Sequence, residues 1–161
     1  MTMAPMKVRL FSKIKMPASP GDCWEWIGGK NSLGYGLFYR DGRQGGAHRA
    51  TYEVYNGPIA DGLVIDHLCH NTGCVNPDHL RAVTRKQNQE HRQGPNRGSR
   101  SGERGVRWCS QKRKWQALVG HNYERHHGGY FETVDEAAEA ARQLRLRLHT
   151  HSDKDKNEGN E

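Results

Sequence analysis

The sequence predicts an α+β fold built from two small domains, and three observations point to it. Runs of β-type composition are followed by helical periodicity in both halves of the chain. Only 34% of the 161 residues are hydrophobic, which is too little for one large core. The stretch HRQGPNRGSRSGER at 91–104 contains no apolar residue. We therefore expect domains at 21–91 and 104–149, joined by a linker at 92–103.

The two ends of the chain are expected to be unstructured. Residues 1–20 carry no clear turn or cap signals, and the tail at 150–161 is polar and without periodicity. We therefore expect a flexible N-terminus and a disordered C-terminus.

The first domain is expected to begin with a hairpin and a short helix. Leu37–Arg40 has β-type composition, and Asp41-Gly42 readily adopts the positive φ angles of a tight turn. A helix is predicted over His48–Tyr55 and should end at Asn56-Gly57-Pro58.

The remainder of this domain is predicted as strand, loop, strand and helix. The two strands are Leu63–Ile65, which leads directly into Asp66-His67, and Arg81–Val83. Thr84 and Gln87 are spaced as a capping box for a helix that continues to about residue 91.

The second domain is predicted to be a three-stranded antiparallel sheet packed on one helix. The sequences RGVRW, KWQALVG and GGYFET are short β-type runs separated by polar turns. Thr133 and Glu136 form a capping box for the helix that follows. The apolar face of this helix consists of Ala137, Ala141, Leu144 and Leu148.

The charge of the chain favours a polyanionic partner. Lys and Arg number 25 against 18 Asp and Glu, a formal net charge of +7. No signal peptide is visible, and no segment approaches the roughly 18 apolar residues of a membrane helix. We expect a cytoplasmic protein without membrane contact. In a reducing compartment its four cysteines should be metal ligands or free thiols.

Three residues that can bind metal occur at five-residue steps in the segment HLCHNTGCVNPDHL, namely Cys69, Cys74 and His79. A structural zinc site takes four tetrahedral nitrogen or sulfur ligands, so a fourth is needed. Cys23 is the candidate, with His70 as its competitor. Four protein ligands leave no open position, so this zinc would be structural.

The same segment, together with VTRKQN, resembles the ββα-metal core of the HNH, or His-Me finger, endonucleases, especially their zinc-containing homing-endonuclease branch. The resemblance implies that His67 is the general base and that Asn88 binds the catalytic Mg²⁺. The family's zinc ligands fall on Cys23, Cys69, Cys74 and His79.

Asp66 is a candidate second magnesium ligand, although alternation along a strand would turn it away from His67. His79 could alternatively support the catalytic site. The basic segment with His48 and Arg49, and Arg40 before it, resembles an element that precedes the core in phage-borne relatives and could contact the phosphate.

The second domain resembles the DNA-binding domain of plant ethylene-response factors, the APETALA type. The matching landmarks are Arg104-Gly105-Val106, Lys114-Trp115-Gln116-Ala117, Gly129-Tyr130-Phe131 and Glu136-Ala137-Ala138. In that family the exposed sheet face enters the major groove of DNA. The residues implied for DNA binding here are Arg104, Arg107, Trp108, Arg113, Lys114 and Trp115.

Taken together, the sequence predicts a site-specific or nicking endonuclease acting on double-stranded DNA, with structural Zn²⁺ and catalytic Mg²⁺. The resemblance implies a phage or bacterial origin, and a homodimer is compatible with it. The alternative is a non-enzymatic DNA-binding protein, such as a transcriptional regulator, in which the zinc core is a docking scaffold.

Overall fold

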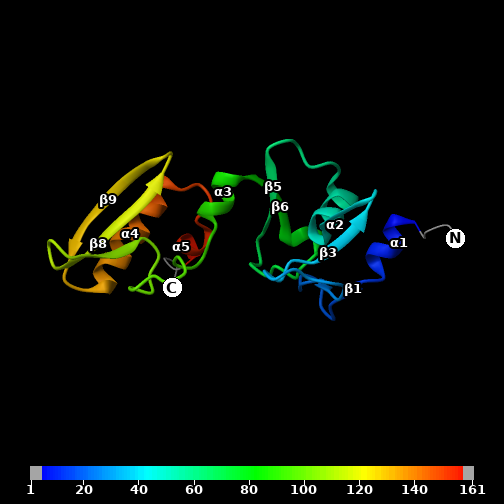
Figure 1. The fold of residues 1–161 in the computed structure, drawn as a ribbon, viewed down its shortest axis with the longest axis horizontal. Coiled ribbons are helices and arrows are strands. Elements are labelled where there is room, and N and C mark those ends of the chain that lie inside the picture. The colour runs from blue at the N-terminus through cyan, green and yellow to red at the C-terminus, as the bar shows by residue number, and fades with distance from the viewer. Residues whose placement is uncertain (1–4, 158–161) are drawn as a thin grey trace. The chain divides into compact units, whose positions relative to one another are not determined.

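The computed structural model describes residues 5–157, which divide into two compact units, Met1–Arg85 and Lys86–Glu161 (Figure 1). Each unit has its own hydrophobic core. The sheets within the described residues are small and antiparallel, and helices follow the strands in both units. The predicted α+β class is therefore confirmed. No helix in residues 5–157 is both long and apolar enough to cross a membrane.

The first unit consists of short elements. In chain order they are α1 (Met6–Phe11), β1 (Ile14–Lys15), β2 (Glu25–Trp26), β3 (Leu37–Arg40), β4 (Arg43–Gly46), α2 (Ala47–Asn56), β5 (Leu63–His67), the 3₁₀ turn η1 (Pro77–His79) and β6 (Leu80–Thr84). The predicted Asp-Gly hairpin is confirmed, since Asp41 and Gly42 have φ angles of 50° and 74° between β3 and β4. Gly57, with a φ angle of 82°, ends α2 as expected.

The core of the first unit forms around Trp26, which is 1% exposed. Its indole packs edge-on against Phe38, and the ring lies so close to Gly36 that a Cβ there would be 2.6 Å from it. Leu10 of α1 is fully buried in this core, and Ile14 of β1 is 8% exposed. The expectation of a flexible N-terminus is therefore wrong for the described part of 1–20, because these two apolar side chains fix it to the core. Residues 1–4 lie outside the described range.

β5 and β6 form the hairpin on which the candidate catalytic residues lie. His67 pairs with Leu80 at one end of the ladder, and Leu63 pairs with Thr84 at the other. The connecting loop spans residues 68–79 and ends in η1. α3 (Arg85–Glu90) starts directly after β6, and the division between the units falls after its first residue.

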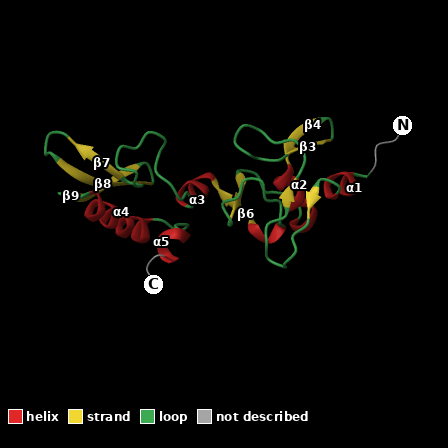
Figure 2. Cartoon of the chain, turned by 90° about the horizontal axis from the view of Figure 1, so that it is seen from below, coloured by secondary structure: helices red, strands yellow, loops and turns green. Residues whose placement is uncertain are grey.

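The second unit consists of a three-stranded sheet and its covering helix. Its remaining elements are β7 (Val106–Cys109), β8 (Lys114–His121), β9 (Glu124–Phe131), α4 (Val134–Leu148) and α5 (Asp153–Asn157). The strand order is β7-β8-β9, and α4 lies along one face of the sheet (Figure 2). The predicted capping box of Thr133 and Glu136 is confirmed at the start of α4. The core lies between sheet and helix and contains Val106, Ala117, Val119, Ala137, Ala141 and Leu144.

The tail expected to be disordered from residue 150 is partly ordered. α5 packs on α4, where Asp155 receives two hydrogen bonds from the Arg145 guanidinium, at 2.8 and 2.6 Å. Both side chains are buried. A buried guanidinium needs a carboxylate partner, and this requirement orders the tail as far as α5. Residues 158–161 lie outside the described range.

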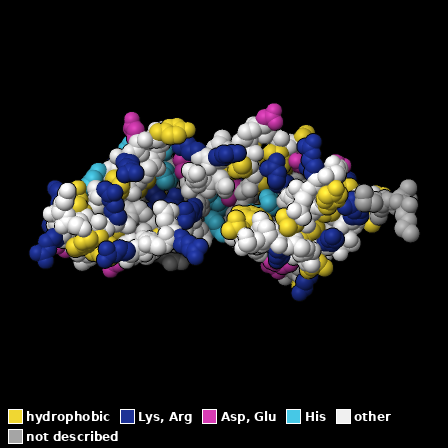
Figure 3. All heavy atoms as spheres, in the orientation of Figure 1, with side chains coloured by type: hydrophobic (Ala, Val, Ile, Leu, Met, Phe, Trp, Pro, Cys, Tyr) yellow, Lys and Arg dark blue, Asp and Glu magenta, His cyan; other side chains and the backbone are white. Residues whose placement is uncertain are grey.

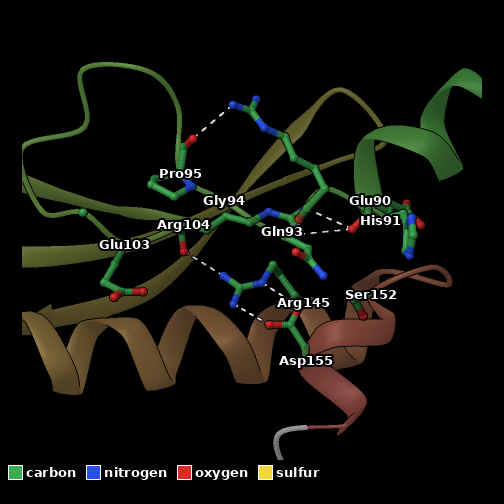
Figure 4. A pocket seen from close by; sticks show the side chains of 12 residues that line it. Glu90, His91, Gln93, Gly94, Pro95, Glu103, Arg104, Arg145, Ser152 and Asp155 are labelled. Carbon is green, nitrogen blue, oxygen red and sulfur yellow. Dashed lines mark hydrogen bonds and ion pairs between the residues drawn. The ribbon is translucent and has the colours of Figure 1, made fainter. Parts of the chain in front are cut away.

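The segment expected to be a linker, 92–103, lies within the second unit and borders a pocket of about 380 Å³ (Figure 4). Arg104 donates to the backbone carbonyls of Glu90 and Arg92. Ser101 donates to the carbonyl of Val106. These hydrogen bonds hold a segment that has no apolar side chain of its own.

Candidate functional site

Four side chains from two separate stretches of the first unit converge on one point. Cys23 precedes β2, Cys69 and Cys74 lie in the β5–β6 loop, and His79 ends η1. Their potential ligand atoms all lie within 4.8 Å of one another. His79 Nδ1 lies 3.6 Å from the sulfur of Cys23 and 3.5 Å from that of Cys74.

Asn76 shapes the loop that carries these ligands. Its side chain is 1% exposed, donates to the carbonyl of Asp22 at 2.8 Å and accepts from the amide of Asp78 at 3.0 Å. The first bond joins the loop to the segment of Cys23, and the second caps the turn that presents His79. Asn76 thus supports the ligand loop through these two bonds.

The residues of this cluster fit a structural zinc ion. Three sulfurs and one imidazole nitrogen are the donors that zinc prefers, and their mutual separations suit a tetrahedral shell. Burial raises the pKa of the Cys69 and Cys74 thiols. A divalent cation would stabilise the thiolates that burial otherwise disfavours. His70 is exposed and is not one of the four grouped residues.

His67 lies at the end of β5 beside this cluster and is 6% exposed. Its Nε2 is 3.0 Å from the carbonyl oxygen of Cys74. Because a carbonyl only accepts, Nε2 carries the proton and Nδ1 presents a lone pair. Burial lowers the pKa of His67, against smaller opposing effects of the Cys74 carbonyl and Asp66. A neutral imidazole with a defined tautomer is suited to accept a proton.

Two aromatic rings surround the His67 imidazole. The rings of His48, on α2, and of Tyr35 lie 4.9 and 5.8 Å from it, centroid to centroid. They also contact each other at 5.4 Å. The sequence predicts His48 in a basic element that contacts the phosphate, whereas no sequence pattern indicates Tyr35. No periodicity or spacing in the sequence relates these two residues to His67. Tertiary packing alone brings them beside the β5–β6 hairpin.

His48 should make the stability of the protein depend on pH. Burial, and to a smaller extent His67 and Arg49, lowers the pKa of His48 from 6.5 to about 3. The unfolded chain binds a proton at His48 more readily than the folded protein does. The stabilisation from the neutral His48 ring is therefore complete above the ordinary pKa of histidine, and it is lost as pH falls below that pKa. The free energy of unfolding should fall by up to about 1.4 kcal/mol per pH unit from this group.

The measurement is denaturant unfolding of wild type and of His48→Phe between about pH 7 and 5, with zinc present throughout. The phenylalanine ring retains the packing but cannot titrate, so its curve should be flatter by the contribution of His48. Parallel curves would remove His48 from this role.

Asp66 is held by an ion pair. The Arg81 Nε donates to its Oδ2 at 2.9 Å, across the β5–β6 ladder in which the two residues are paired. β5 continues through His67, so Asp66 and His67 alternate along a strand, as the sequence analysis had considered. A magnesium ion bound to Asp66 would have to compete with Arg81.

The other candidates of the first motif have separate positions. Asn88 is exposed on α3. Arg40 ends β3 and forms an ion pair with Glu53 of α2. Arg49 lies on α2 and is partly buried. Within the first unit the structure thus brings the four cluster residues together, and it places His48 against His67.

Strand alternation in the second unit separates its predicted DNA-binding residues into two groups. Trp108 and Trp115 are cross-strand partners on the face that α4 covers, with ring centroids 5.1 Å apart. Trp115 packs against the core, so the expectation that it contacts DNA from an exposed face is not supported by its position. Arg107, next along β7, points to the opposite face and donates to Gln116.

The remaining basic candidates surround this outer face. Lys114 pairs with Glu132 at 2.7 Å, and Arg113 lies at the turn between β7 and β8 with a φ angle of 52°. Arg104, which precedes β7, donates to the backbone carbonyls of Glu90 and Arg92. Several Lys and Arg side chains stand out on the visible surface of this unit (Figure 3).

Comparison with known proteins identifies a nuclease-type segment. Residues 46–90 match the family model described as HNH endonuclease. Protein 7.7 of Escherichia phage T7 is 45% identical over 69 residues, which are 43% of this chain and 53% of that protein. Protein 2.8 of the same phage is 34% identical over 85 residues, 52% of this chain and 56% of that protein.

A third relative is covered more completely. Protein 3.8 of phage T7 is 32% identical over 85 residues, which are 53% of this chain and 67% of that protein. The chain spans about half the length of the first two relatives. No solved structure matches the chain significantly.

Proposed function

The chain belongs to a family of phage proteins that includes protein 3.8 of phage T7, and it carries an HNH endonuclease domain at residues 46–90; on this premise we propose that it is a Mg²⁺-dependent DNA endonuclease with a structural zinc ion. One observation carries the proposal. The His67 imidazole is held through Nε2 by the Cys74 carbonyl, beside four residues arranged as zinc ligands. The loop that forms the zinc cluster therefore also orients the base.

His67 is the general base of the proposed reaction. Its Nδ1 takes a proton from a water molecule, whose oxygen attacks the phosphorus, and the bond to the 3′ oxygen breaks. The products then carry 5′-phosphate and 3′-hydroxyl ends. Bound Mg²⁺ would supply charge stabilisation at the phosphate and the leaving oxygen. Tyr35 and His48 limit the solvation of the imidazole and keep it neutral.

Asp66 and Asn88 are the proposed magnesium ligands. Both offer oxygen atoms, which are the donors that Mg²⁺ prefers. The ion pair with Arg81 orients the carboxylate of Asp66. Asn88 lies on α3, the helix that follows β6.

The zinc cluster has a structural role in this proposal. It joins the segment before β2 to the β5–β6 loop, and its binding energy becomes folding energy for a unit with a small core. On the basis of this ligand set we propose that the protein belongs to the zinc-containing homing-type branch. We further propose that it acts on double-stranded DNA in the bacterial cytoplasm during phage infection.

Plasmid cleavage tests the activity. The zinc-loaded protein should nick or cut plasmid only when Mg²⁺ is added. Omission of Mg²⁺ is a better control than a chelator, which would also remove zinc. Asn88→Ala should lower cleavage without changing zinc content. DNA binding without cleavage, in Mg²⁺ and in Mn²⁺, would refute the nuclease and favour a non-enzymatic DNA-binding protein.

The second unit is proposed to bind DNA through the outer face of β7 and β8, as its resemblance to ethylene-response-factor domains suggests. Arg107, with Gln116, stands at the centre of this face, and Lys114 lies at its edge. Basic side chains on an exposed sheet face can neutralise phosphates and reach base edges.

Arg107→Ala should reduce the salt dependence of DNA binding. Removal of one phosphate contact lowers the slope of log affinity against log salt by about 1. Fluorescence anisotropy on a labelled duplex over a salt series measures this slope. Arg142→Ala is the matched control, since that guanidinium is bound to Glu139 on α4. Equal slopes for both variants and wild type would exclude Arg107 from the interface.

A further inference from the structure

A second group of metal-binding side chains lies in the second unit, away from the cysteine cluster. Glu90 ends α3, His121 ends β8, and His149 follows the last residue of α4. Their potential ligand atoms lie within 4.8 Å of one another. Three elements that are distant in the sequence thus place one carboxylate and two imidazoles together.

The inward atoms of this group are buried and have no hydrogen-bond partner among the described residues. They are Glu90 Oε1, His121 Nδ1 and His149 Nδ1. Glu90 is 4% exposed and His149 is 9% exposed. An unsatisfied buried polar atom destabilises the fold, because it has lost its hydrogen bonds to water and gained none in the protein. Three such atoms facing one another indicate that something absent from the protein chain satisfies them.

The outward atoms of the same residues are held by hydrogen bonds. Glu90 Oε2 accepts from the amide and the hydroxyl of Thr150, at 2.9 and 3.1 Å. His149 Nε2 lies 3.2 Å from the carbonyl of Gly120 and therefore donates to it. This tautomer leaves a lone pair on Nδ1, directed to the other two residues. Metal-binding histidines and carboxylates are commonly oriented in this way by their second atoms.

The nearest charged and titratable side chains leave these three inward atoms without a hydrogen bond. Lys86 Nζ and His121 Nδ1 each lie 3.6 Å from Glu90 Oε1, beyond hydrogen-bond distance. The His121 ring stacks on that of His149 with centroids 5.9 Å apart, and His126 of β9 lies on its other side at 6.2 Å.

We propose that Glu90, His121 and His149 form a second divalent-metal site, of the zinc class. Two imidazoles and a carboxylate suit Zn²⁺ or a similar transition metal, whereas Mg²⁺ and Ca²⁺ take oxygen ligands. Three protein ligands leave a fourth position for water, unlike the closed shell of the cysteine cluster. The site joins the ends of α3, β8 and α4 and so stabilises the second unit. It is independent of the proposed nuclease reaction.

Cobalt titration of the full-length protein tests this proposal. With excess Mg²⁺ present to occupy the proposed Asp66 and Asn88 site, metal-stripped, reduced wild type should bind two Co²⁺ equivalents per chain. The cysteine cluster shows thiolate charge-transfer absorption, whereas the second site has only the weaker visible bands of nitrogen and oxygen ligands. Failure of the cysteine cluster is therefore recognised separately, as loss of the charge-transfer band. If wild type binds no Co²⁺ outside the cysteine cluster, the proposal is overturned.

Variants identify the ligands. His149→Ala and His121→Ala should each lose the thiolate-free equivalent and keep the charge-transfer band. His127→Ala, on β9 outside the group, should bind Co²⁺ as wild type does. Thr150→Val retains the ligands and the backbone bond to Glu90 but loses the hydroxyl bond, and should bind about 10-fold or more weakly. If both His149→Ala and His121→Ala still bind the Co²⁺ equivalent that lacks thiolate ligands, the proposal is contradicted. Near-ultraviolet circular dichroism checks that each variant is folded.

Discussion

His67→Ala should abolish Mg²⁺-dependent DNA cleavage while leaving the protein folded and its zinc content unchanged. The expected loss in rate is about 10²–10⁴-fold, the usual contribution of a general base. Nε2 of His67 bonds to the backbone carbonyl of Cys74, whereas the four groups that would hold zinc are the three cysteine sulfurs and the His79 ring. Single-turnover cleavage of plasmid, with zinc analysis of the same sample, measures both quantities.

His70→Asn provides the matched control for that experiment. His70 is an exposed histidine in the same loop, with a φ angle of 55°, which asparagine tolerates. It should cleave DNA at the wild-type rate and retain one zinc ion in the cysteine cluster. Undiminished cleavage by His67→Ala would remove His67 from the reaction. Loss of zinc in His70→Asn would instead make His70 a ligand.

Cys74→Ser should cause the largest loss of stability. The Cys74 side chain is fully buried, and its sulfur also accepts the amide hydrogen of Asn76 at 3.4 Å. A structural zinc ion contributes about 10–16 kcal/mol of apparent binding free energy in small domains. Serine is a poor zinc ligand, so the first unit should lose both the metal and much of its folding free energy. Metal analysis and thermal unfolding at fixed zinc concentration measure this effect.

Cys109→Ser is the control for the cysteine variant. Cys109 lies on β7 in the second unit and belongs to no metal-binding group among the described residues. Its replacement should change neither zinc content at the cysteine cluster nor the unfolding of the first unit. Unchanged zinc content and stability in Cys74→Ser would show that the cluster is not a zinc site.

Local patterns explain which elements could be predicted. The Asp-Gly turn at 41–42 and the capping box at Thr133 and Glu136 depend on backbone preferences that act over two to four residues. The five-residue spacing of Cys69, Cys74 and His79 likewise lies within one loop. Such signals are complete in the local sequence, and the structure contains the elements and the grouping that they indicated.

The errors concern segments whose order depends on distant partners. α1 is held by the burial of Leu10 in a core formed mainly by later residues, and α5 by the pairing of Asp155 with Arg145. Trp115, which the resemblance implies for DNA binding, is partly buried and packs against the core of the second unit. In each case a partner many residues away decides the environment.

The sequence by itself determined the α+β class, the main strands and helices, and which residues could bind zinc, because periodicity, capping and ligand spacing act over short distances. The tertiary structure alone decided the surroundings of His67, where Tyr35, His48 and the Cys74 carbonyl meet. It alone also brought Glu90, His121 and His149 together. The physical reason is that these features arise from contacts between separate elements. Long-range packing creates the burial, the hydrogen bond that sets the tautomer and the convergence of ligands.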